Sequence, residues 1–402
     1  MKGTAWSHQK GGGGRNRTAV RGFAGPCLNH SATPPRRPGE PNGDGSPQTQ
    51  CDSHCSWLNR GMRIAVVAPP WTPIPPPLYG GIELVVDQLA TGLQKAGHDV
   101  TLFATGDSTS QVPLKWVLPE AEGMRIGMAV PEMRHILFSY KSMTDYDVVH
   151  DHTIIGPFYA ERYPGLPVTT TIHGPFNEEL TDLYSTLAPR VPIVCISHAQ
   201  RRAAPEVQVA RVIHHGIDAS VFVPGDGEGD DYGEYLLFLG RMSPDKGAHR
   251  AIEVARKAGV RVLLAAKMRE PWERRYFEEY VEPYLGDSAV YLGEVSHEHK
   301  LELLRGATAL LFPIRWNEPF GMVMLEAFAS GTPVIAFPEG AAPEVIQDGR
   351  TGFLCDDEAA MADAVGRIGE IDRADCRASV EGYFSTDRMV AEHLELYEQL
   401  IG

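Results

Sequence analysis

The chain has 402 residues, of which 43% are apolar and 22% charged, a balance typical of a globular protein large enough for two domains. Its net charge of −15 argues against a dedicated nucleic-acid-binding protein, which would present a basic surface. No apolar run approaches the roughly 20 residues that a transmembrane helix needs, and no signal peptide is recognisable, so we expect a cytoplasmic protein without a transmembrane segment.

The first 61 residues differ in composition from the rest. They contain a run of four glycines at 11–14 and a proline- and arginine-rich stretch at 34–38, and they carry 8 Lys and Arg against 3 Asp and Glu. With no hydrophobic period, residues 1–61 are predicted to be a disordered low-complexity extension. Because Met62 opens a clean strand pattern, one hypothesis is that translation starts there; an arginine-rich targeting peptide is the alternative.

Strand and helix patterns alternate from Met62 onwards. A continuous apolar run at 64–68 predicts a strand buried on both faces, and apolar residues at helical spacing predict a helix over 82–96 that ends at Gly97. Further strands are predicted at 100–104, 148–150, 168–172, 193–196 and 211–213. This series defines a first domain, residues 62–225.

The same alternation restarts after a polar break at 225–231. Strands are predicted at 235–239, 260–265, 290–292, 309–312 and 334–337, and helices over 248–258 and around 301–304. Two such series predict the α/β class, with two doubly wound Rossmann-like domains facing across a cleft. The second domain spans 226–386, and an apolar-striped helix over 387–402 ends the chain.

The segment 312–326 reads FPIRWNEPFGMVMLE and contains the most informative pattern. It places Glu318 just before a predicted helix, with Pro319 at an early helical position and Gly321 removing side-chain bulk. Glu326 follows slightly over two turns later, near the azimuth of Glu318 if the helix starts early. Because a helix N-terminus favours phosphate, this pattern suits a sugar nucleotide, although solvated helix carboxylates would explain the spacing alone.

Three further segments follow predicted strands, and we expect them to face the same cleft. Arg241 and Lys246 lie just after strand 235–239, where two cations can hold a diphosphate, although an ordinary basic turn has the same composition. Gly81 belongs to a glycine pair that precedes the first helix and allows close backbone approach. His173 ends strand 168–172 and can hydrogen-bond a sugar hydroxyl. The neighbouring histidines at 150, 152, 214 and 215 are better explained as structural, although Asp151-His152 could face the acceptor.

Taken together, these motifs resemble retaining glycosyltransferases of family 4, which have the GT-B fold. The resemblance covers about residues 62–402 and includes Gly331-Thr332-Pro333-Val334-Ile335 and Gly293-Glu294-Val295. It implies that Glu318 binds donor-sugar hydroxyls, Glu326 the ribose, and Arg241 with Lys246 the diphosphate. It places His173 beside the transferred sugar and Val295 at the base. The remaining donor contacts it implies are Gly81, Phe320, Gly321, Met322 and Val323.

The resemblance implies a metal-independent enzyme without a cofactor, whose partners are a UDP- or GDP-sugar donor and an acceptor that is a sugar, glycolipid or small molecule. It also implies that the last helix crosses back to the first domain. No Asp-x-Asp metal motif stands at a strand end, and Cys51 and Cys55 lack a second ligand pair at zinc-site spacing.

Alternatives on the same fold are a nucleotide-sugar epimerase, a glycoside phosphorylase and a non-catalytic sugar-nucleotide-binding protein. A dinucleotide oxidoreductase would need a complete glycine fingerprint, which is missing.

Overall fold

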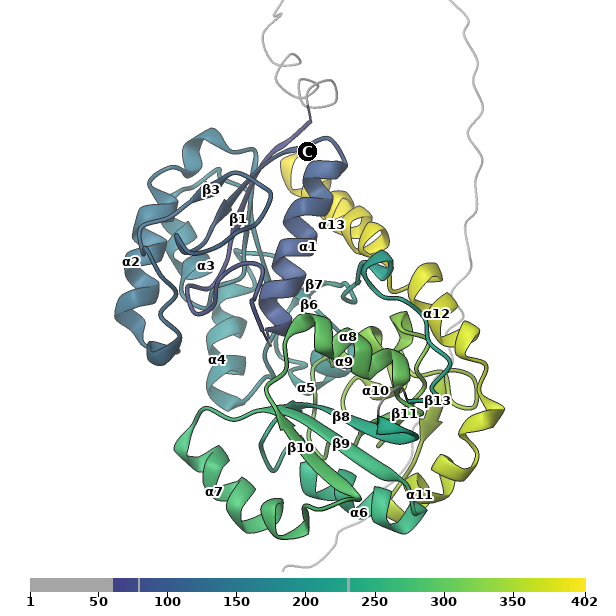
Figure 1. Ribbon diagram of the computed structural model, residues 1–402. Coiled ribbons are helices and arrows are strands. Elements are labelled where there is room, and N and C mark those ends of the chain that lie inside the picture. The colour runs from purple at the N-terminus through teal and green to yellow at the C-terminus, as the bar shows by residue number, and fades with distance from the viewer. Residues whose placement is uncertain (1–60, 79, 230–231) are drawn as a thin grey trace, which may run out of the picture. The chain divides into compact units, whose positions relative to one another are not determined.

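The computed structural model describes residues 61–78, 80–229 and 232–402, which contain two parallel β-sheets with helices packed on them (Figure 1). The predicted extension therefore lies outside the described residues, apart from Gly61. Two doubly wound sheets confirm the predicted α/β fold class. No helix in the described ranges is long and apolar enough to cross a membrane.

The first sheet has seven strands in the order β3-β2-β1-β4-β5-β6-β7, all parallel. Its strands are β1 (Arg63–Val67), β2 (Asp99–Phe103), β3 (Leu114–Lys115), β4 (Val148–Asp151), β5 (Val168–Ile172), β6 (Ile193–Cys195) and β7 (Val209–Val212). Its helices are α1 (Gly81–Lys95), α2 (Ala129–Tyr140), α3 (Gly156–Tyr159), α4 (Glu178–Leu187) and α5 (His198–Ala203), with 3₁₀ turns η1 (Gly123–Arg125), η2 (Met143–Asp145), η3 (Ala160–Arg162) and η4 (Ala219–Val221).

The second sheet has six parallel strands in the order β10-β9-β8-β11-β12-β13. They are β8 (Tyr235–Arg241), β9 (Arg261–Lys267), β10 (Ala289–Gly293), β11 (Ala309–Phe312), β12 (Val334–Ala336) and β13 (Gly352–Leu354). The helices are α6 (Ala248–Ala258), α7 (Pro271–Tyr280), α8 (His297–Gly306), α9 (Met322–Ala329), α10 (Ala342–Val345), α11 (Glu358–Gly366), α12 (Arg373–Gly382) and α13 (Thr386–Ile401), with 3₁₀ turns η6 (Glu282–Tyr284) and η7 (Ile368–Glu370).

Alternate residues of β1 explain why the first sheet is buried on both faces. Ile64 and Val66 belong to the hydrophobic cluster that includes α1, whereas Ala65 and Val67 belong to a separate cluster on the other face. A strand of this kind has no polar face, which is why its sequence is a continuous apolar run. The strand order reverses between β1 and β4 and again between β8 and β11, and ligands of doubly wound sheets bind at such points.

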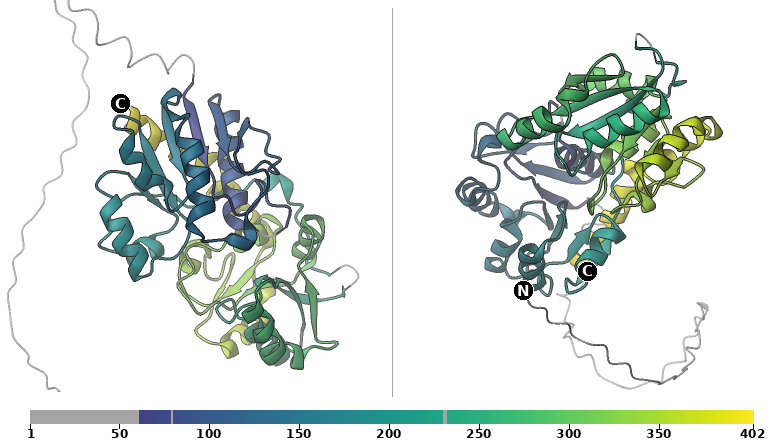
Figure 2. Two further views of the ribbon diagram at one scale, coloured as in Figure 1. Left: turned by 90° about the vertical axis from the view of Figure 1, so that its left-hand side faces the viewer. Right: turned by 90° about the horizontal axis from the view of Figure 1, so that it is seen from below.

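The C-terminal helix α13 packs beside α1 of the first sheet, at the yellow end of the chain in Figures 1 and 2. Met389 and Tyr397 are fully buried in the same cluster as Met62. At the crossing, a side chain on Gly92 would place its Cβ 2.5 Å from Cγ2 of Val390, so the close approach of the two helices requires glycine here.

Candidate functional site

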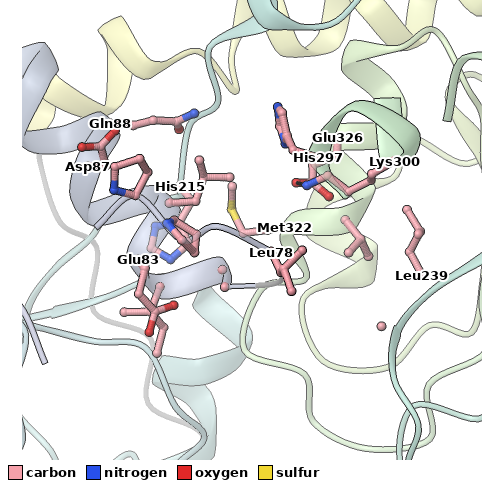
Figure 3. Close-up of a pocket in the computed structure, with 18 of the residues that line it drawn as sticks. Leu78, Glu83, Asp87, Gln88, His215, Leu239, His297, Lys300, Met322 and Glu326 are labelled. Atoms are coloured by element: carbon pink, nitrogen blue, oxygen red, sulfur yellow. Dashed lines mark hydrogen bonds and ion pairs between the residues drawn. The ribbon is translucent and has the colours of Figure 1, made fainter. Parts of the chain in front are cut away.

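A cavity of about 830 Å³ is lined by residues of both sheets, within the range of natural ligand sites. One wall is α1, which carries Glu83, Asp87 and Gln88; the other is formed around α8 and α9, with Lys300 and Glu326 (Figure 3). The cavity thus lies beside the glycine loop that precedes α1 and beside the loops that follow β8 and β11.

Lys246 and Glu318 form an ion pair in the wall of the second domain. Lys246 Nζ donates to Glu318 Oε2 at 2.5 Å, and each side chain is only 13% exposed. The same Nζ lies 5.3 Å from the centre of the Trp316 ring. A lysine and a carboxylate are therefore held side by side in the wall, where one can meet an anionic group and the other a hydroxyl.

A tight turn of the neighbouring loop fixes the backbone of Glu318. The N–H of Ala341 donates to the Glu318 carbonyl at 3.0 Å. Gly340 has φ +55°, and a Cβ there would lie 2.3 Å from the same carbonyl oxygen. Only glycine fits so close to another backbone, so Gly340 positions Glu318 without contacting the cavity itself.

Helix α9 starts later than the sequence predicts. Pro319 was expected at an early helical position, but the helix begins at Met322 because Gly321 takes the left-handed conformation, with φ +88°. Glu318 therefore lies on the loop before α9, and the predicted helical azimuth shared with Glu326 is wrong. A Cβ on Gly321 would also lie 2.8 Å from Cζ of Phe312, so both the backbone conformation and this close contact favour glycine here.

Glu326 projects from α9 and pairs with a residue that the motif analysis missed. Its side chain is almost buried, and Lys300 Nζ of α8 donates to Oε1 at 2.5 Å. Both residues line the cavity, together with the predicted Val295, Phe320, Met322 and Val323. Lys300 stands 26 residues from Glu326 in the sequence, so no local pattern pointed to it.

Arg241 differs from the other predicted site residues because it is outside the cavity lining. Its Nε lies 3.6 Å from Glu273 Oε1 and its Nη2 lies 3.7 Å from Asp245 Oδ2. Its guanidinium also lies 5.6 Å from the Trp272 ring. Of the two predicted diphosphate-binding cations, only Lys246 faces the cavity in this conformation.

Gly81 lies opposite α9, at the first residue of α1. A Cβ at this position would be 3.9 Å from Cγ of Met322, so the N-terminus of α1 directly faces the start of α9. The free N–H groups of both first turns are thus directed towards one region of the cavity.

His173 also lines the cavity, and it belongs to a chain of stacked imidazoles. Its Nε2 shares a hydrogen bond of 2.9 Å with His152 Nδ1, and its ring stacks on His215 at 5.4 Å. Burial lowers the pKa of His173 to about 3 and that of His152 and His215 well below the usual value. These rings are therefore neutral at physiological pH.

His150 is fully buried and lies outside the cavity lining. His150 bonds Tyr397 at 2.6 Å and Thr171 at 2.8 Å. Asp151 is fully buried and accepts hydrogen bonds from Tyr140 and Thr153, so it does not face the cavity. Burial raises the Asp151 pKa to about 7.

His214 belongs to a polar contact that joins the two domains. Glu344 of the second domain accepts from the N–H groups of His198 and Ala199 at 2.7 and 2.6 Å, and it lies 2.9 Å from His214 Nε2. Burial alone would raise the Glu344 pKa, but these hydrogen bonds hold it below its usual range. The contact fixes α5 against the segment of α10, beside the cavity.

Within the described ranges, no group of three or more His, Cys, Asp or Glu side chains gathers in a way that could hold a metal ion. The charged lining residues that the motifs did not single out are Glu83, Asp87, Lys95, Asp218, Lys267 and Lys300. Glu83 stands two residues after the glycine pair, and that neighbourhood was the available signal for it.

Two family models match the chain. Residues 227–377 match "Glycosyl transferases group 1" and residues 79–221 match "Glycosyltransferase Family 4", so together they cover well over half of the sequence. Phosphatidyl-myo-inositol mannosyltransferase of Mycolicibacterium smegmatis is 29% identical, over 78% of this chain and 86% of its own length. Glycogen synthase of Mycobacterium tuberculosis is 26% identical, over 76% and 86%.

Solved structures agree with these matches. AviGT4, a glycosyltransferase involved in avilamycin A biosynthesis, has a TM-score of 0.67 at 27% identity, covering 85% of this chain and 98% of its own. Anabaena HepE in complex with UDP and glucose has a TM-score of 0.68 at 18% identity, over 84% and 100%, which shows a shared fold.

Proposed function

The chain belongs to the family 4 glycosyltransferases, which have the GT-B fold, and from that premise we propose that it transfers a sugar from a UDP- or GDP-sugar to an acceptor hydroxyl with retention of anomeric configuration. The observation that carries the proposal is the pairing of Lys246 with Glu318 and of Lys300 with Glu326 in one cavity wall, on either side of the start of α9.

In this proposal the second domain binds the donor. Glu318 accepts hydrogen bonds from hydroxyls of the donor sugar, and Glu326 accepts from the ribose. Lys246 and the first-turn N–H groups of α9 meet the diphosphate, where they stabilise the charge that develops as the nucleotide leaves. Val295 and its neighbours contact the base, and His173, held neutral, hydrogen-bonds the transferred sugar.

Arg241 joins the diphosphate only after its side chain turns. Its present contacts with Glu273 and Asp245 are long, at 3.6 and 3.7 Å, and the Arg241 side chain is 40% exposed. A diphosphate offers a stronger, bidentate partner for the guanidinium, so donor binding draws Arg241 towards the loop of Lys246.

We propose that attack occurs on the face from which the nucleotide leaves. The bond from the anomeric carbon to the diphosphate oxygen breaks, and the bond from that carbon to the acceptor oxygen forms. The acceptor proton passes to the departing phosphate. The protein's part is electrostatic and positional, so we expect no catalytic metal.

Printed names of similar proteins support the donor class. HepE is described in complex with UDP-glucose, and the Mycolicibacterium smegmatis relative is named a mannosyltransferase. The names of the relatives do not indicate a single class of acceptor, because one relative is named for D-inositol 3-phosphate and another for glycogen. Three buried free thiols, Cys195, Cys355 and Cys376, fit a reducing compartment, and we place the enzyme in the cytoplasm.

Thermal unfolding against a panel of nucleotides and nucleotide sugars tests the donor assignment. A ligand at about 100 times its Kd stabilises by roughly 2.7 kcal/mol. We expect a rise in Tm with UDP or GDP compounds, and we expect that rise to disappear in Lys246→Met. An undiminished rise in the variant would place the nucleotide elsewhere.

A transfer assay separates the remaining readings. NMR of the anomeric proton should show a retained configuration, and EDTA should leave the rate unchanged. Conversion of the nucleotide sugar without an acceptor would indicate an epimerase, and a requirement for inorganic phosphate would indicate a phosphorylase. Tight nucleotide binding with no turnover over a broad acceptor panel would indicate a non-catalytic binding protein.

A further inference from the structure

The chemistry of the cavity wall opposite the donor carries a second inference. We propose that the acceptor is an uncharged polyhydroxylated molecule and that the wall formed by α1 rejects a phosphorylated acceptor. The inference rests on the proposed function, since it assigns the substrate class of the same site.

Glu83 is the first observation. This residue lines the cavity from the first turn of α1 and is only 9% exposed. Within the described part of the chain its carboxylate has no hydrogen-bond or ion-pair partner. The Glu83 oxygens are not among the fully buried, unpartnered atoms of the described residues, so they are open to the cavity and can accept hydrogen bonds from ligand hydroxyls.

The next turn of α1 repeats the pattern. Asp87 Oδ1, Gln88 Oε1 and the nearby Ser110 Oγ are buried polar atoms without a hydrogen-bond partner in the described residues. All three residues line the cavity. Burial raises the pKa of Asp87. Figure 3 shows Glu83, Asp87 and Gln88 on the side of the cavity opposite Lys300 and Glu326. The wall is therefore rich in hydrogen-bond acceptors that need donors.

Near Glu83, the described lining contributed by the first domain contains no cation. His173 and His215 line the cavity from the first domain, but burial keeps both neutral. Lys95, the only first-domain lysine among the described lining residues, stands twelve residues after Glu83 on α1, or about 18 Å along the helix axis.

Two cations of the opposite wall are paired within that wall, Lys246 with Glu318 and Lys300 with Glu326. Lys267, at the end of β9, is the cation that acts on Glu83. Burial lowers the Lys267 pKa, and the charges of Glu294 and Glu83 partly oppose that shift.

Neither a cation cluster nor an arginine is present in the described first-domain lining, whereas three carboxylates are, those of Glu83, Asp87 and Asp218. The free N–H groups at the start of α1 face the start of α9, where we place the donor diphosphate. Like charges at short range in a partly buried site repel strongly, so we expect at least about 100-fold discrimination.

The experiment uses the full chain with its identified donor and pairs of acceptors that differ by one phosphate: myo-inositol against inositol 1-phosphate, and glucose against glucose 6-phosphate. Glucosamine tests a cationic acceptor. We expect transfer to a neutral member and a kcat/KM at least about 100-fold lower for its phosphate ester. Faster reaction with the phosphate ester or with glucosamine would overturn the inference.

Two variants test whether the carboxylates cause the discrimination. Glu83→Gln and Asp87→Asn keep the side-chain size and remove the charge, so each should lower the ratio of neutral to phosphorylated acceptor by about tenfold. Lys95→Gln, on the same helix and in the same cavity lining, is the matched control and should not lower the ratio. An unchanged ratio in both carboxylate variants would contradict the proposed cause.

The donor measurement keeps this inference separable from the proposed function. Loss of nucleotide-induced stabilisation would remove the proposed function itself. Intact donor binding, with transfer to no neutral polyol, would leave donor binding standing and overturn only the acceptor assignment.

Discussion

The pair formed by Lys246 and Glu318 should link stability to activity, and a double-mutant cycle can separate the two. Lys246→Met leaves the largely buried Glu318 carboxylate without its cationic partner. Glu318→Gln leaves the Lys246 ammonium group without its anionic partner. The double variant removes both charges while keeping similar volumes. If the pair exists as described, the double variant should lose less stability than the sum of the losses in the two single variants.

The magnitude follows from the burial of the pair. Removing one partner of a buried ion pair costs about 3–5 kcal/mol, and the 13% exposure of each side chain argues for the lower end, about 3 kcal/mol. Each kcal/mol corresponds to about 2–4 °C in Tm for a domain of this size. Replacing both charges together is often nearly neutral, so the double variant should recover at least about 1.5 kcal/mol relative to the sum of the singles.

Thermal unfolding of the four proteins measures the interaction energy, and nucleotide release during transfer measures activity. We expect all three variants to lose at least about 100-fold in kcat/KM, including the double variant whose stability is restored. Additive effects on Tm would refute the buried pair. Restored activity in the double variant would refute the catalytic site, because a merely structural pair could be replaced without loss.

Three further predictions address the surroundings of the site. Gly321→Ala should cost more than Gly349→Ala, because both positions have positive φ but only Gly321 would also clash, with Phe312; chemical denaturation of the two variants compares them. Glu344→Ala should lower Tm and broaden the distribution of domain orientations in small-angle scattering. The control is Glu370→Ala, which removes an exposed ion pair and should leave both quantities unchanged. His173 and His393, with pKa values lowered to about 3 and 4 against 6.5 when unfolded, should make stability fall as pH drops from about 6.5 towards 4; pH-dependent Tm should therefore be flatter in His173→Asn.

The sign of the pH effect follows from proton uptake on unfolding. A neutral buried imidazole must gain a proton when it is released below pH 6.5, so the unfolded state binds more protons and stability rises with pH in this window. Asp151, whose pKa is raised to about 7, acts in the opposite direction in the same window, so the comparison with His173→Asn is the test. The same slope of Tm against pH in the variant and the parent would show that the His173 ring is solvated.

The class of fold could be predicted from the sequence because strands buried on both faces must be apolar throughout. The strands at 168–172 and 309–312 and the helix at 248–258 match the structure residue for residue. The short edge strands β3 and β13 were missed, since two or three residues are too few to show a period. Helix α7 was also missed because its charged sequence, PWERRYFEEY, shows little apolar period.

The sequence by itself determined which residue types stand after which strands: the glycine pair before α1, Lys246 after β8, and Glu318 and Glu326 around the start of α9. These are local facts, since a turn or a helix start depends on a few neighbouring residues. Only the tertiary structure decided how the groups pair. Lys246 meets Glu318 across 72 residues, Arg241 turns to Glu273, and Glu83 faces the cavity from α1. Such outcomes depend on packing between distant segments, where burial fixes both the charge of a group and the partner it can reach.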